Sequence, residues 1–410
     1  VRLTIIFLKE YFNINLYLLS TQEPNDDLKP YINDYLILSD SKERKLTFFN
    51  YLFNIRNLFS TLSFFKKYQP DIIHIHNFYG SLSPSILSAI KLYKNGANKN
   101  IKIFQTVHDF SLLCPNSSFY DYQRGKICTD CINFKYMYPI VINRCFHGSI
   151  IKSTMKFLRT TIAINFLNHV EVIDKFITPS YLLYNFLSSK YPHKSIYIVR
   201  NPIDFKTCST NQLSIEQLQK IKEDTIVYIG RLSYEKGIHL LIEAFNRYSI
   251  NNSSAKLYIV GSGTIEYENK LRELAGKNKL IFFTGYMNKN EIFNLLKKAK
   301  LCVFPSIWME NAPLVIAESL INYCIPVVPK HGGFEELSYA YGCNFFIEGI
   351  NNRDKENIIW EMVKLIDFYL NNYYNYLTQL YECRNKVFEV HDPKKYVTQL
   401  LKIYKDSYEQ

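Results

Sequence analysis

The chain has 410 residues, 47% of them apolar, which is enough for two domains with sizeable cores. No apolar run is long enough to span a bilayer, the start shows no signal-peptide pattern, and nine scattered cysteines favour a reducing cytoplasm over a disulfide framework. The formal net charge of +12 favours an anionic partner, but charge alone does not choose among a nucleotide, a phospholipid surface and a nucleic acid.

The beginning of the sequence has the periodicity of an amphipathic helix over Val1–Lys9, followed by a strand over residues 15–20. A doubly wound domain opens with a strand and a turn ahead of such a helix. We therefore expect that the first strand and its loop are missing from this sequence.

Residues 42–67 combine aromatic with basic side chains. An amphipathic helix of this composition can pack its aromatic rings into the domain core or lie on an anionic membrane. Core helices are commoner than membrane-surface helices, so core packing is favoured and the membrane alternative stays open. The residues concerned are Phe48, Phe49, Tyr51, Phe53, Phe59, Phe64 and Phe65, with Lys42, Arg44, Lys45, Arg56, Lys66 and Lys67.

Two buried strands, expected over residues 70–77 and 101–107, run into polar residues that include His76 and His108. The carboxyl ends of parallel strands are where ligands bind in open α/β folds. One histidine at such an end is usually only a satisfied polar residue. Two at neighbouring strand ends are more suggestive of a site.

Four cysteines come next in a symmetric pattern, with thirteen residues on either side of a C-x2-C pair: Cys114, Cys128, Cys131 and Cys145. Four thiolates could close a tetrahedral zinc site, and a metal would order long loops that otherwise lack a core. The outer spacings are longer than compact zinc modules use. We expect a structural zinc here, with free thiols as the alternative.

Residues 152–199 alternate between helices and strands, the strands being expected at 175–178 and 196–199. A turn comes after them, and residues 207–223 are polar and loosely helical. We place the domain boundary near 203–206. The predicted domains are residues 1–203 with a cysteine-rich insert at 110–150, residues 204–385, and a C-terminal helix within 386–410.

The second half of the chain alternates strands and helices, with strands expected at 225–229, 255–260, 280–284 and 325–328. Such alternation predicts a parallel sheet with helices on both faces. Glycine comes after each strand, where the backbone turns sharply or approaches a ligand. The glycines are Gly230, Gly237, Gly261, Gly263, Gly285, Gly332 and Gly333.

The most informative stretch is 306–326, which comes after a short buried strand at 301–304. Pro313 suits the first turn of a helix, which would put Glu310 at the mouth of that helix and Glu318 inside it. The amides of Asn311, Ala312 and Leu314 would favour an anion. A phosphorylated sugar fits an anion site flanked by two carboxylates. Taken alone, two glutamates eight residues apart are more often ordinary surface and helix residues.

Together these motifs make the chain resemble a family 4 glycosyltransferase with the GT-B fold. The resemblance covers nearly the whole chain, apart from the first strand and its glycine-rich loop. The cysteine-rich insert resembles one in members that build bacterial capsule, O-antigen or exopolysaccharide. The motifs, in family order, are residues 71–77, His108-Asp109, Asn201–Asp204, Gly230–Leu232 with Lys236-Gly237, Gly261–Gly263, Phe283–Gly285, Pro305-Ser306, Glu310 to Glu318, and Gly332-Gly333.

The resemblance implies a fold and a donor. The fold would be two doubly wound Rossmann-like domains facing a cleft, with the last helix returning to the N-terminal domain. The donor would be a UDP- or GDP-sugar held mainly by the C-terminal domain, with Arg231 and Lys236 on the diphosphate. Glu318 would accept the ribose hydroxyls, and Glu310 the sugar hydroxyls. The resemblance places the remaining ligands at Gly261, Asn311, Ala312, Pro313 and Leu314 near the phosphate or sugar, Gly285 and Tyr286 by the base, and His108 by the sugar.

The family retains anomeric configuration, which implies a front-face mechanism that needs no catalytic metal. The implied acceptor is a lipid-linked glycan at the inner face of the cytoplasmic membrane, met by a peripheral protein. The missing glycine-rich loop, together with Asn311 where the family usually has glycine, leaves an alternative: a glycosyltransferase-like protein that binds nucleotide sugar without turnover. A nucleic-acid partner is not expected, because the basic residues are dispersed. No lysine site for a phosphorylase cofactor is found.

Overall fold

The computed structural model describes residues 1–12, 14–39, 48–76, 82–97, 100–205, 212–350 and 354–409. They form two compact units: unit 1 comprises residues 1–203 with 391–410, and unit 2 comprises residues 204–390. The expected features at residues 42–47, Asn77 and 207–211 lie outside the described residues. None of the helices described is both long and apolar enough to cross a membrane.

Unit 2 contains a six-stranded sheet in the order β11-β10-β9-β12-β13-β14, and all of its neighbouring strands are parallel. Apolar residues with high strand propensity fill its centre, because a sheet covered on both faces buries both sides of each strand. The strands are β9 (Glu223–Ile229), β10 (Lys256–Val260), β11 (Ile281–Gly285), β12 (Ala299–Val303), β13 (Ile325–Pro329) and β14 (Phe346–Ile347).

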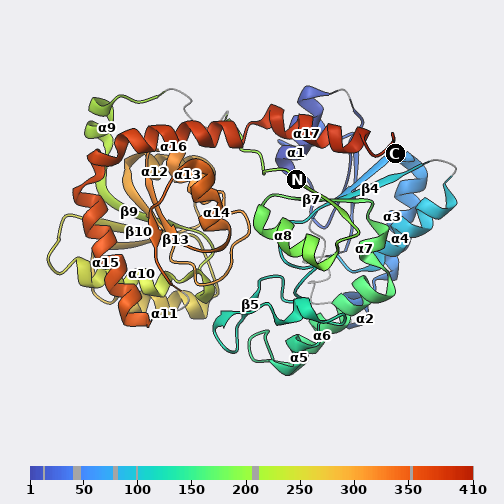
Figure 1. The fold of residues 1–410 in the computed structure, drawn as a ribbon, viewed down its shortest axis with the longest axis horizontal. Coiled ribbons are helices and arrows are strands. Elements are labelled where there is room, and N and C mark those ends of the chain that lie inside the picture. Colours follow the sequence, from blue (N-terminus) through green and yellow to red (C-terminus); the bar gives the residue numbers. More distant parts are fainter. Residues whose placement is uncertain are drawn as a thin grey trace. The chain divides into compact units, whose positions relative to one another are not determined.

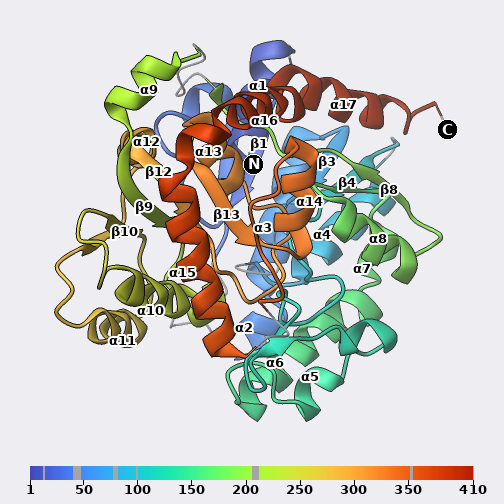
Figure 2. The same cartoon turned by 60° about the vertical axis from the view of Figure 1, so that its left-hand side comes forward.

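Helices connect these strands and cover the sheet (Figure 1). Helix α10 contacts both α11 and α15, and helices α13, α14 and α16 contact one another. Figure 2 shows α10 and α11 lying beside each other, below the strands. The helices of unit 2 are α9 (Ile215–Ile221), α10 (Ile238–Tyr248), α11 (Ile265–Ala275), α12 (Lys289–Lys298), α13 (Val315–Ile321), α14 (Gly332–Tyr341), α15 (Lys355–Asn371) and α16 (Leu377–Val390).

Local sequence fixes several helix ends. Asn288 and Glu291 form a reciprocal capping box at the start of α12, and Ser214 and Gln217 form one at the start of α9. Each box satisfies backbone N–H groups that the first turn of a helix leaves without partners.

Unit 1 has a four-stranded parallel sheet, β3-β4-β7-β8, and a separate parallel pair, β1-β2. The strands are β1 (Tyr17–Ser20), β2 (Asp34–Ile37), β3 (Ile72–Ile75), β4 (Lys102–Thr106), β7 (Lys175–Thr178) and β8 (Ser195–Ile198). The main helices are α1 (Arg2–Tyr11), α2 (Phe48–Leu52), α3 (Ile55–Tyr68), α4 (Ser85–Gly96), α6 (Ile150–Thr161), α7 (His169–Val172) and α8 (Tyr181–Lys190).

Helix α3 buries some of the aromatic residues of the 42–67 stretch and leaves others exposed. Its buried side includes Leu58, Phe64 and Phe65, which pack into the core of unit 1 as the favoured alternative requires. Phe59 and Ile55 are exposed on the same helix. Helix α3 is therefore a core helix that leaves part of its apolar surface uncovered, whereas Phe48 and Phe49 of α2 are exposed.

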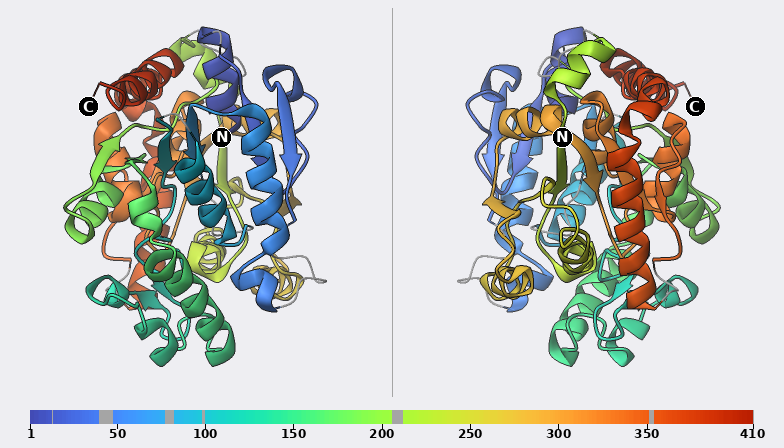
Figure 3. Two further views of the ribbon diagram at one scale, coloured as in Figure 1. Left: turned by 90° about the vertical axis from the view of Figure 1, so that its right-hand side faces the viewer. Right: turned by 90° about the vertical axis from the view of Figure 1, so that its left-hand side faces the viewer.

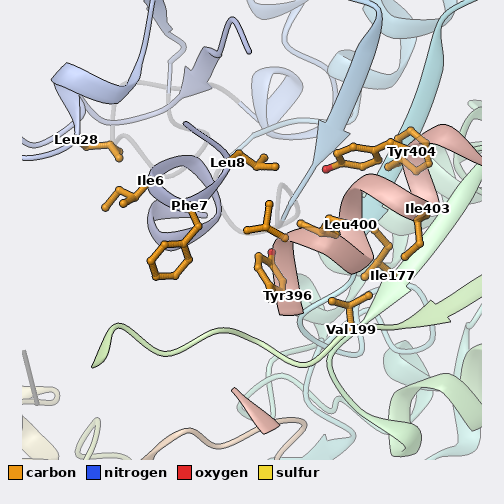
Figure 4. Packing of buried hydrophobic residues seen from close by; sticks show 12 residues of the cluster. Ile6, Phe7, Leu8, Leu28, Ile177, Val199, Tyr396, Leu400, Ile403 and Tyr404 are labelled. Carbon is orange, nitrogen blue, oxygen red and sulfur yellow. The ribbon is translucent and has the colours of Figure 1, made fainter. Parts of the chain in front are cut away.

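The last helix, α17 (Pro393–Lys405), packs against α1 within unit 1. Figure 4 shows Ile6, Phe7 and Leu8 of α1 near Tyr396 and Leu400 of α17, in a core that also includes strand residues. The Thr4 and Tyr396 hydroxyls are 2.8 Å apart and share a hydrogen bond in this core. The C-terminal segment is thus an integral part of unit 1.

The insert at 110–150 has a core of its own. It comprises a short antiparallel hairpin, β5 (Tyr120–Asp121) and β6 (Lys126–Ile127), a 3-10 turn η2 (Asp130–Asn133) and helix α5 (Pro139–Ile142). Met137 and Ile140 are buried together with two of the cysteines, and Phe157 of α6 packs against them. The rings of Phe110 and Phe119 stack at 4.2 Å. Apolar packing therefore orders these loops.

Candidate functional site

The strand order of unit 2 reverses between β9 and β12, the two neighbours at the centre of the sheet. In open parallel sheets, ligands bind outside the carboxyl ends of the strands at such a switch point. Two loops lie there, residues 230–237 after β9 and 304–310 after β12. Both carry charged residues that the sequence motifs predict as ligands.

The two loops pack directly against each other. Gly237 has a left-handed φ of 70°, and a Cβ atom there would lie 1.9 Å from the carbonyl oxygen of Pro305. The amide of Ile307 donates a hydrogen bond of 3.0 Å to the carbonyl of Glu235. Only glycine allows this approach without moving the neighbouring backbone. The packing fixes how the side chains of the two loops meet.

Lys236 and Glu310, one from each loop, form a half-buried ion pair. Trp308 donates from Nε1 to the same carboxylate oxygen of Glu310 at 2.8 Å. The Lys236 ammonium also lies 5.0 Å from the centroid of the Trp308 ring. A cation and an acceptor carboxylate are thus held side by side, partly shielded from water, so each interacts strongly with an added charge.

Arg231 is the second cation of the site. Its Nη2 donates to Oε1 of the buried Glu235 at 2.6 Å, and the Ser233 hydroxyl donates to the same oxygen at 2.8 Å. The Arg231 side chain is otherwise exposed. Because a guanidinium carries five N–H donors, this arrangement orients Arg231 while leaving most of its fork directed to solvent.

The glycines after β9 and β10 allow the loops that follow these two strands to pack closely against each other. A Cβ atom on Gly261 would lie 1.9 Å from the carbonyl oxygen of Gly230, and Leu232 donates to the carbonyl of Ser262 at 2.9 Å. Gly285, the last residue of β11, differs from them. It has a φ of 71° with open space around it, and the Tyr286 side chain beside it is the most exposed large apolar or aromatic side chain among the described residues.

The helix expected from Pro313 begins two residues later, because α13 runs from Val315 to Ile321 with Leu314 as its N-cap. Glu318 therefore lies in the first turn, and residues 311–314 form a non-helical connection. Burial raises the pKa of Glu318, which Lys289 partly opposes. Asn311 is buried, and the amide of Gly333 donates to the carbonyl of Glu310 at 2.7 Å.

Three residues that no sequence motif indicated join this group. Glu235 accepts a hydrogen bond from Arg231, while Trp308 donates one to Glu310 and lies under the Lys236 ammonium. His331, the N-cap of α14, has both ring nitrogens buried with no hydrogen-bond partner among the described residues. Its pKa is lowered to about 4 by burial, against the attraction of Glu310. Trp308 lies two residues from Glu310, and only that proximity could have indicated it.

In unit 1, three histidines stack at the carboxyl ends of β3 and β4. Nδ1 of His76 lies 3.0 Å from Nε2 of His108, and the His74 and His76 rings stack at 4.4 Å. His74 also shares hydrogen bonds with the hydroxyls of Tyr404, at 2.6 Å, and Thr106, at 2.8 Å. Burial lowers the pKa of His74 to about 3 and that of His108 to about 4. The cluster is therefore neutral near pH 7.

The predicted zinc site is not supported. Among the described residues, which include Cys114, Cys128, Cys131 and Cys145, no three histidine, cysteine, aspartate or glutamate side chains are grouped to hold a metal ion. All four are free thiols, and burial raises their pKa values, that of Cys145 to about 12. The apolar core of the insert also removes the reason for expecting a metal.

The structure thus brings Arg231, Lys236 and Glu310 together at one switch point. Glu318 on α13 and Tyr286 after β11 occupy other connections of the same sheet. His108 lies in unit 1. The chemistry of the central group suits an anion with hydroxyl groups: two cations for the anion, and a carboxylate to accept hydroxyl protons.

Comparisons with known proteins extend this interpretation. Residues 211–368 match the family described as "Glycosyl transferases group 1". An uncharacterized glycosyltransferase of Methanocaldococcus jannaschii, MJ1059, is 28% identical over 288 residues, covering 67% of this chain and 59% of that protein. A lipopolysaccharide 1,2-N-acetylglucosaminetransferase of Salmonella typhimurium is 30% identical over 174 residues, covering 40% of this chain and 46% of that protein. The chain spans less than two thirds of either curated relative.

Among solved structures, Anabaena Alr3699/HepE in complex with UDP-glucose resembles this chain with a TM-score of 0.65 at 15% identity. The likeness covers 98% of this chain and 95% of that protein. At such low identity it establishes the fold alone: two Rossmann-like units with parallel sheets.

Proposed function

Because this chain belongs to the group 1 glycosyltransferases and has their GT-B fold, we propose that it is a retaining enzyme that transfers a hexose from a nucleotide-diphosphate sugar. The observation that carries the proposal is the group of Arg231, Lys236 and Glu310 at the switch point of unit 2. Loop packing holds these side chains in place before any ligand arrives, and preorganised charges stabilise a transition state most effectively.

Arg231 and Lys236 are the proposed ligands of the diphosphate. Negative charge grows on the leaving nucleoside diphosphate as the glycosidic bond breaks, and two cations offset it without a catalytic metal. Arg231 would fork onto two phosphate oxygens with the N–H donors that Glu235 does not occupy. Lys236 would act as a point charge, shared in the free protein with Glu310.

Glu310 and Glu318 are the proposed hydroxyl acceptors, Glu310 for the transferred sugar and Glu318 for the ribose. The Glu310 carboxylate is oriented by Trp308, which supports a positioning role toward a sugar. The connection of Asn311, Ala312, Pro313 and Leu314, with Gly261, would lie near the phosphate or sugar. The exposed Tyr286 beside Gly285 is assigned to the base, because an aromatic face can stack on it.

The proposed reaction is a front-face substitution. The bond between the anomeric carbon and the β-phosphate oxygen breaks, and its electron pair stays on that oxygen. The acceptor hydroxyl oxygen forms the new bond to the anomeric carbon on the same face, and its proton passes to the released phosphate oxygen. His108, neutral through burial, is assigned a hydrogen bond to a sugar hydroxyl rather than a share of this proton.

The proposed donor is a UDP- or GDP-sugar, and the proposed acceptor is a lipid-linked, growing cell-surface polysaccharide such as capsule or O-antigen. The protein would act at the inner face of the cytoplasmic membrane. The named activity of the Salmonella relative supports a polysaccharide product, and the UDP-glucose in the Anabaena complex supports a nucleotide-sugar donor.

A donor screen tests the proposal. Thermal shifts are measured with UDP-, GDP- and ADP-sugars, followed by a transfer assay with the donor that binds. A ligand at 100 times its dissociation constant stabilises the folded state by about 2.7 kcal/mol, which is readily seen. We expect one nucleotide class to bind and to be turned over. Binding without transfer to any lipid-linked glycan would instead favour a non-catalytic nucleotide-sugar-binding protein.

A further inference from the structure

Two buried cysteines of unit 2 lie in direct contact with each other. Cys343 comes just after helix α14, and Cys383 is on helix α16. The Cys343 thiol donates a hydrogen bond to Sγ of Cys383, and the two sulfurs are 2.7 Å apart. A disulfide bond is about 2.05 Å long, so the sulfurs need to approach by only roughly 0.7 Å to form one. The fold therefore holds together two thiols that a disulfide can join.

The end of α14 fixes the position of Cys343. Gly342 has a left-handed φ of 75°, and its amide donates to the carbonyl of Tyr339 at 3.0 Å. The amide of Cys343 donates to the carbonyl of Ser338 at 2.8 Å. These two bonds form a Schellman motif, a common way to end a helix. The contact with Cys383 is thus built on a regular helix end and not on a loose loop.

A cation lies beside the same helix end. Lys386 is three residues after Cys383 on α16, and residues at that spacing share a face of a helix. A Cβ atom on Gly342 would lie 2.7 Å from Nζ of Lys386, so the ammonium group lies next to the residue before Cys343. The positive charge acts on both cysteines, where it favours a thiolate.

The two thiols differ in how readily they lose a proton. The hydrogen bond from Cys343 lowers the pKa of Cys383, burial opposes that effect, and Lys386 adds to it. Burial, together with the hydrogen bond to Cys383, raises the pKa of Cys343. The thiolate is the reactive form of cysteine. Cys383 is therefore the attacking sulfur of the pair, and Cys343 is a neighbouring thiol that keeps its proton.

A second pair of cysteines, Cys302 on β12 and Cys324 just before β13, is the natural comparison within unit 2. Burial, followed by the hydrogen bond with Cys324, raises the pKa of Cys302 well above its ordinary value. Every residue from 301 to 306 is buried, whereas both sequence neighbours of Cys343 are exposed. A small oxidant therefore reaches the Cys343–Cys383 pair more easily than it reaches Cys302.

From this geometry we propose that Cys343 and Cys383 are a redox-active dithiol, which a peroxide oxidises to a disulfide and small thiols reduce again. The Cys383 thiolate attacks one peroxide oxygen, the O–O bond breaks, and its electron pair leaves with hydroxide, which takes up the proton that Cys383 released. The Cys343 sulfur then attacks the resulting sulfenic acid. The S–S bond forms, the S–O bond breaks, and the leaving hydroxide takes the Cys343 proton. Two thiols and one hydrogen peroxide thus give one disulfide and two waters.

This proposal goes beyond the transfer reaction and does not depend on it. Two thiols alone do not make a metal site, and no group of three metal-ligating side chains is found in the part of the chain that the structure describes. Disulfides that form in a reducing compartment are usually transient, catalytic or redox-sensing. A pair that is oxidised and reduced in turn suits such a compartment, whereas a permanent disulfide does not.

Oxidation of the pair would connect helices that lead to the candidate site. The first turn of α14 contacts that site, because the amide of Gly333 donates to the carbonyl of Glu310 at 2.7 Å. Helix α16 is bonded to α13, which carries Glu318, because Nε of Arg384 donates to the carbonyl of Ile321 at 3.1 Å. Figures 1, 2 and 3 show α16 lying above α13 and α14, both of which it contacts. A disulfide would tie α14 to α16 at the end of α14 that is opposite the site.

The main test maps disulfides in the full-length protein after treatment with hydrogen peroxide. The remaining thiols are alkylated in denaturant, and the digested protein is analysed by mass spectrometry. We expect an intramolecular link between Cys343 and Cys383 that dithiothreitol removes. Because each unit of pKa changes the thiolate fraction about tenfold, Cys302 should lose its thiol at least about tenfold more slowly.

Single substitutions separate the roles of the two sulfurs. In Cys343→Ser the reaction should stop at the sulfenic acid of Cys383, which dimedone traps, whereas Cys383→Ser should leave Cys343 unmodified over the same time. Cys128→Ser, in the insert, is the control and should form the Cys343–Cys383 link at the wild-type rate. The mapping of wild-type protein needs no variant, so it decides the question even where a buried serine prevents folding.

The cation and the stability of unit 2 provide two further readouts. Lys386→Gln removes a charge that favours the thiolate and should slow link formation roughly twofold or more. Lys297→Gln, at an exposed lysine of α12, should leave the rate unchanged. The disulfide should raise the unfolding midpoint of unit 2 by roughly 5 °C or more. Fluorescence of Trp308 and Trp360, both in unit 2, measures that midpoint before and after reduction.

Three results would overturn the proposal. In the first, Cys343 and Cys383 stay free while Cys302 or the cysteines of the insert are oxidised. In the second, links form only between chains. In the third, dimedone modifies Cys343 in the Cys383→Ser variant and fails to modify Cys383 in the Cys343→Ser variant.

Discussion

The two units present different chemistry at the ends of their parallel strands. In unit 2, each cation of the candidate site is held by a carboxylate, Lys236 by Glu310 and Arg231 by Glu235. In unit 1, the corresponding edge carries stacked neutral imidazoles and a tyrosine hydroxyl. Two parallel sheets of the same Rossmann-like kind can therefore carry charged groups or uncharged hydrogen-bonding groups at the ends of their strands. Which of the two they carry depends on the residues that follow each strand.

The contrast extends to buried histidines, and the largest expected effect concerns acid stability. Unit 1 holds five histidines whose pKa values burial lowers below 6.5, two of them to about 3, whereas unit 2 holds two, each at about 4. The five are His74, His76, His108, His169 and His391, and the two are His239 and His331.

Because these folded-state pKa values lie below the unfolded value, the unfolded chain binds protons first as the pH falls. The stabilising effect is complete above about pH 6.5 and is lost as the pH drops from there toward 4. Each histidine lowers the free energy of unfolding by at most about 1.4 kcal/mol per pH unit in this range. Unit 1 should therefore lose stability faster than unit 2 between pH 6.5 and 4.5.

Two signals separate the units. Both tryptophans, Trp308 and Trp360, are in unit 2, so their fluorescence reports that unit alone. Hydrogen exchange of β3, β4 and β7, with labelling time adjusted at each pH for intrinsic exchange, reports unit 1. We expect strand protection to fall at a higher pH than the fluorescence change. Simultaneous loss, or earlier loss in unit 2, would show that the buried histidines do not govern acid stability.

The next effect tests whether unit 2 recognises charge. Arg231→Ala and Glu318→Ala should each lower the transfer rate by about 10² or more, the usual scale for removing one preorganised partner of a transition state. Lys270→Ala and Glu266→Ala are the matched controls, because these two residues form an exposed ion pair on α11. Near-normal turnover in either site variant would show that the donor pocket is wrongly assigned.

A smaller effect, on ligand affinity, tests the role of the Lys236–Glu310 pair. Removing the Glu310 carboxylate releases Lys236 for a phosphate but removes an acceptor for sugar hydroxyls. Glu310→Gln should therefore bind free nucleoside diphosphate several-fold more tightly and the nucleotide sugar more weakly. Isothermal titration of both ligands, repeated with Lys236→Met and the double variant, measures the coupling, which is typically about 0.5–3 kcal/mol for contacting groups.

Two results would contradict the proposed roles of Glu310 as a sugar ligand and as the partner of Lys236. One is parallel weakening of both ligands by Glu310→Gln. The other is additive effects of Lys236→Met and Glu310→Gln within about 0.3 kcal/mol, which is the behaviour of independent positions.

Much of the fold can be predicted from the sequence, because periodicity and breakers are local signals. The strand expected at 175–178 is β7 without change, and those expected at 225–229 and 325–328 differ from β9 and β13 by two residues or fewer. The helix expected from Pro313 starts at Val315 because Pro313 suits a first turn without requiring one. Strand β2, only four residues long, gave no distinct pattern.

Long-range chemistry was less accessible. Lys236 and Glu310 are separated by 74 residues, so only the packing of two strand-end loops reveals their ion pair. The cysteine spacing predicted a metal, since spacing does not report whether apolar residues such as Met137 and Ile140 already provide a core.

The central claim is that the switch-point group of unit 2 binds a nucleotide-diphosphate sugar. Trp308 donates a hydrogen bond to Glu310, and the Lys236 ammonium lies over the Trp308 ring. The fluorescence of Trp308 therefore reports directly on that group. In the variant Trp360→Phe it is the sole tryptophan. Titration with UDP-, GDP- and ADP-sugars should give a saturable fluorescence change for one nucleotide class, and Arg231→Ala should abolish it at the same concentrations. Saturable binding of a nucleotide sugar that leaves Trp308 unchanged and survives Arg231→Ala would contradict the account.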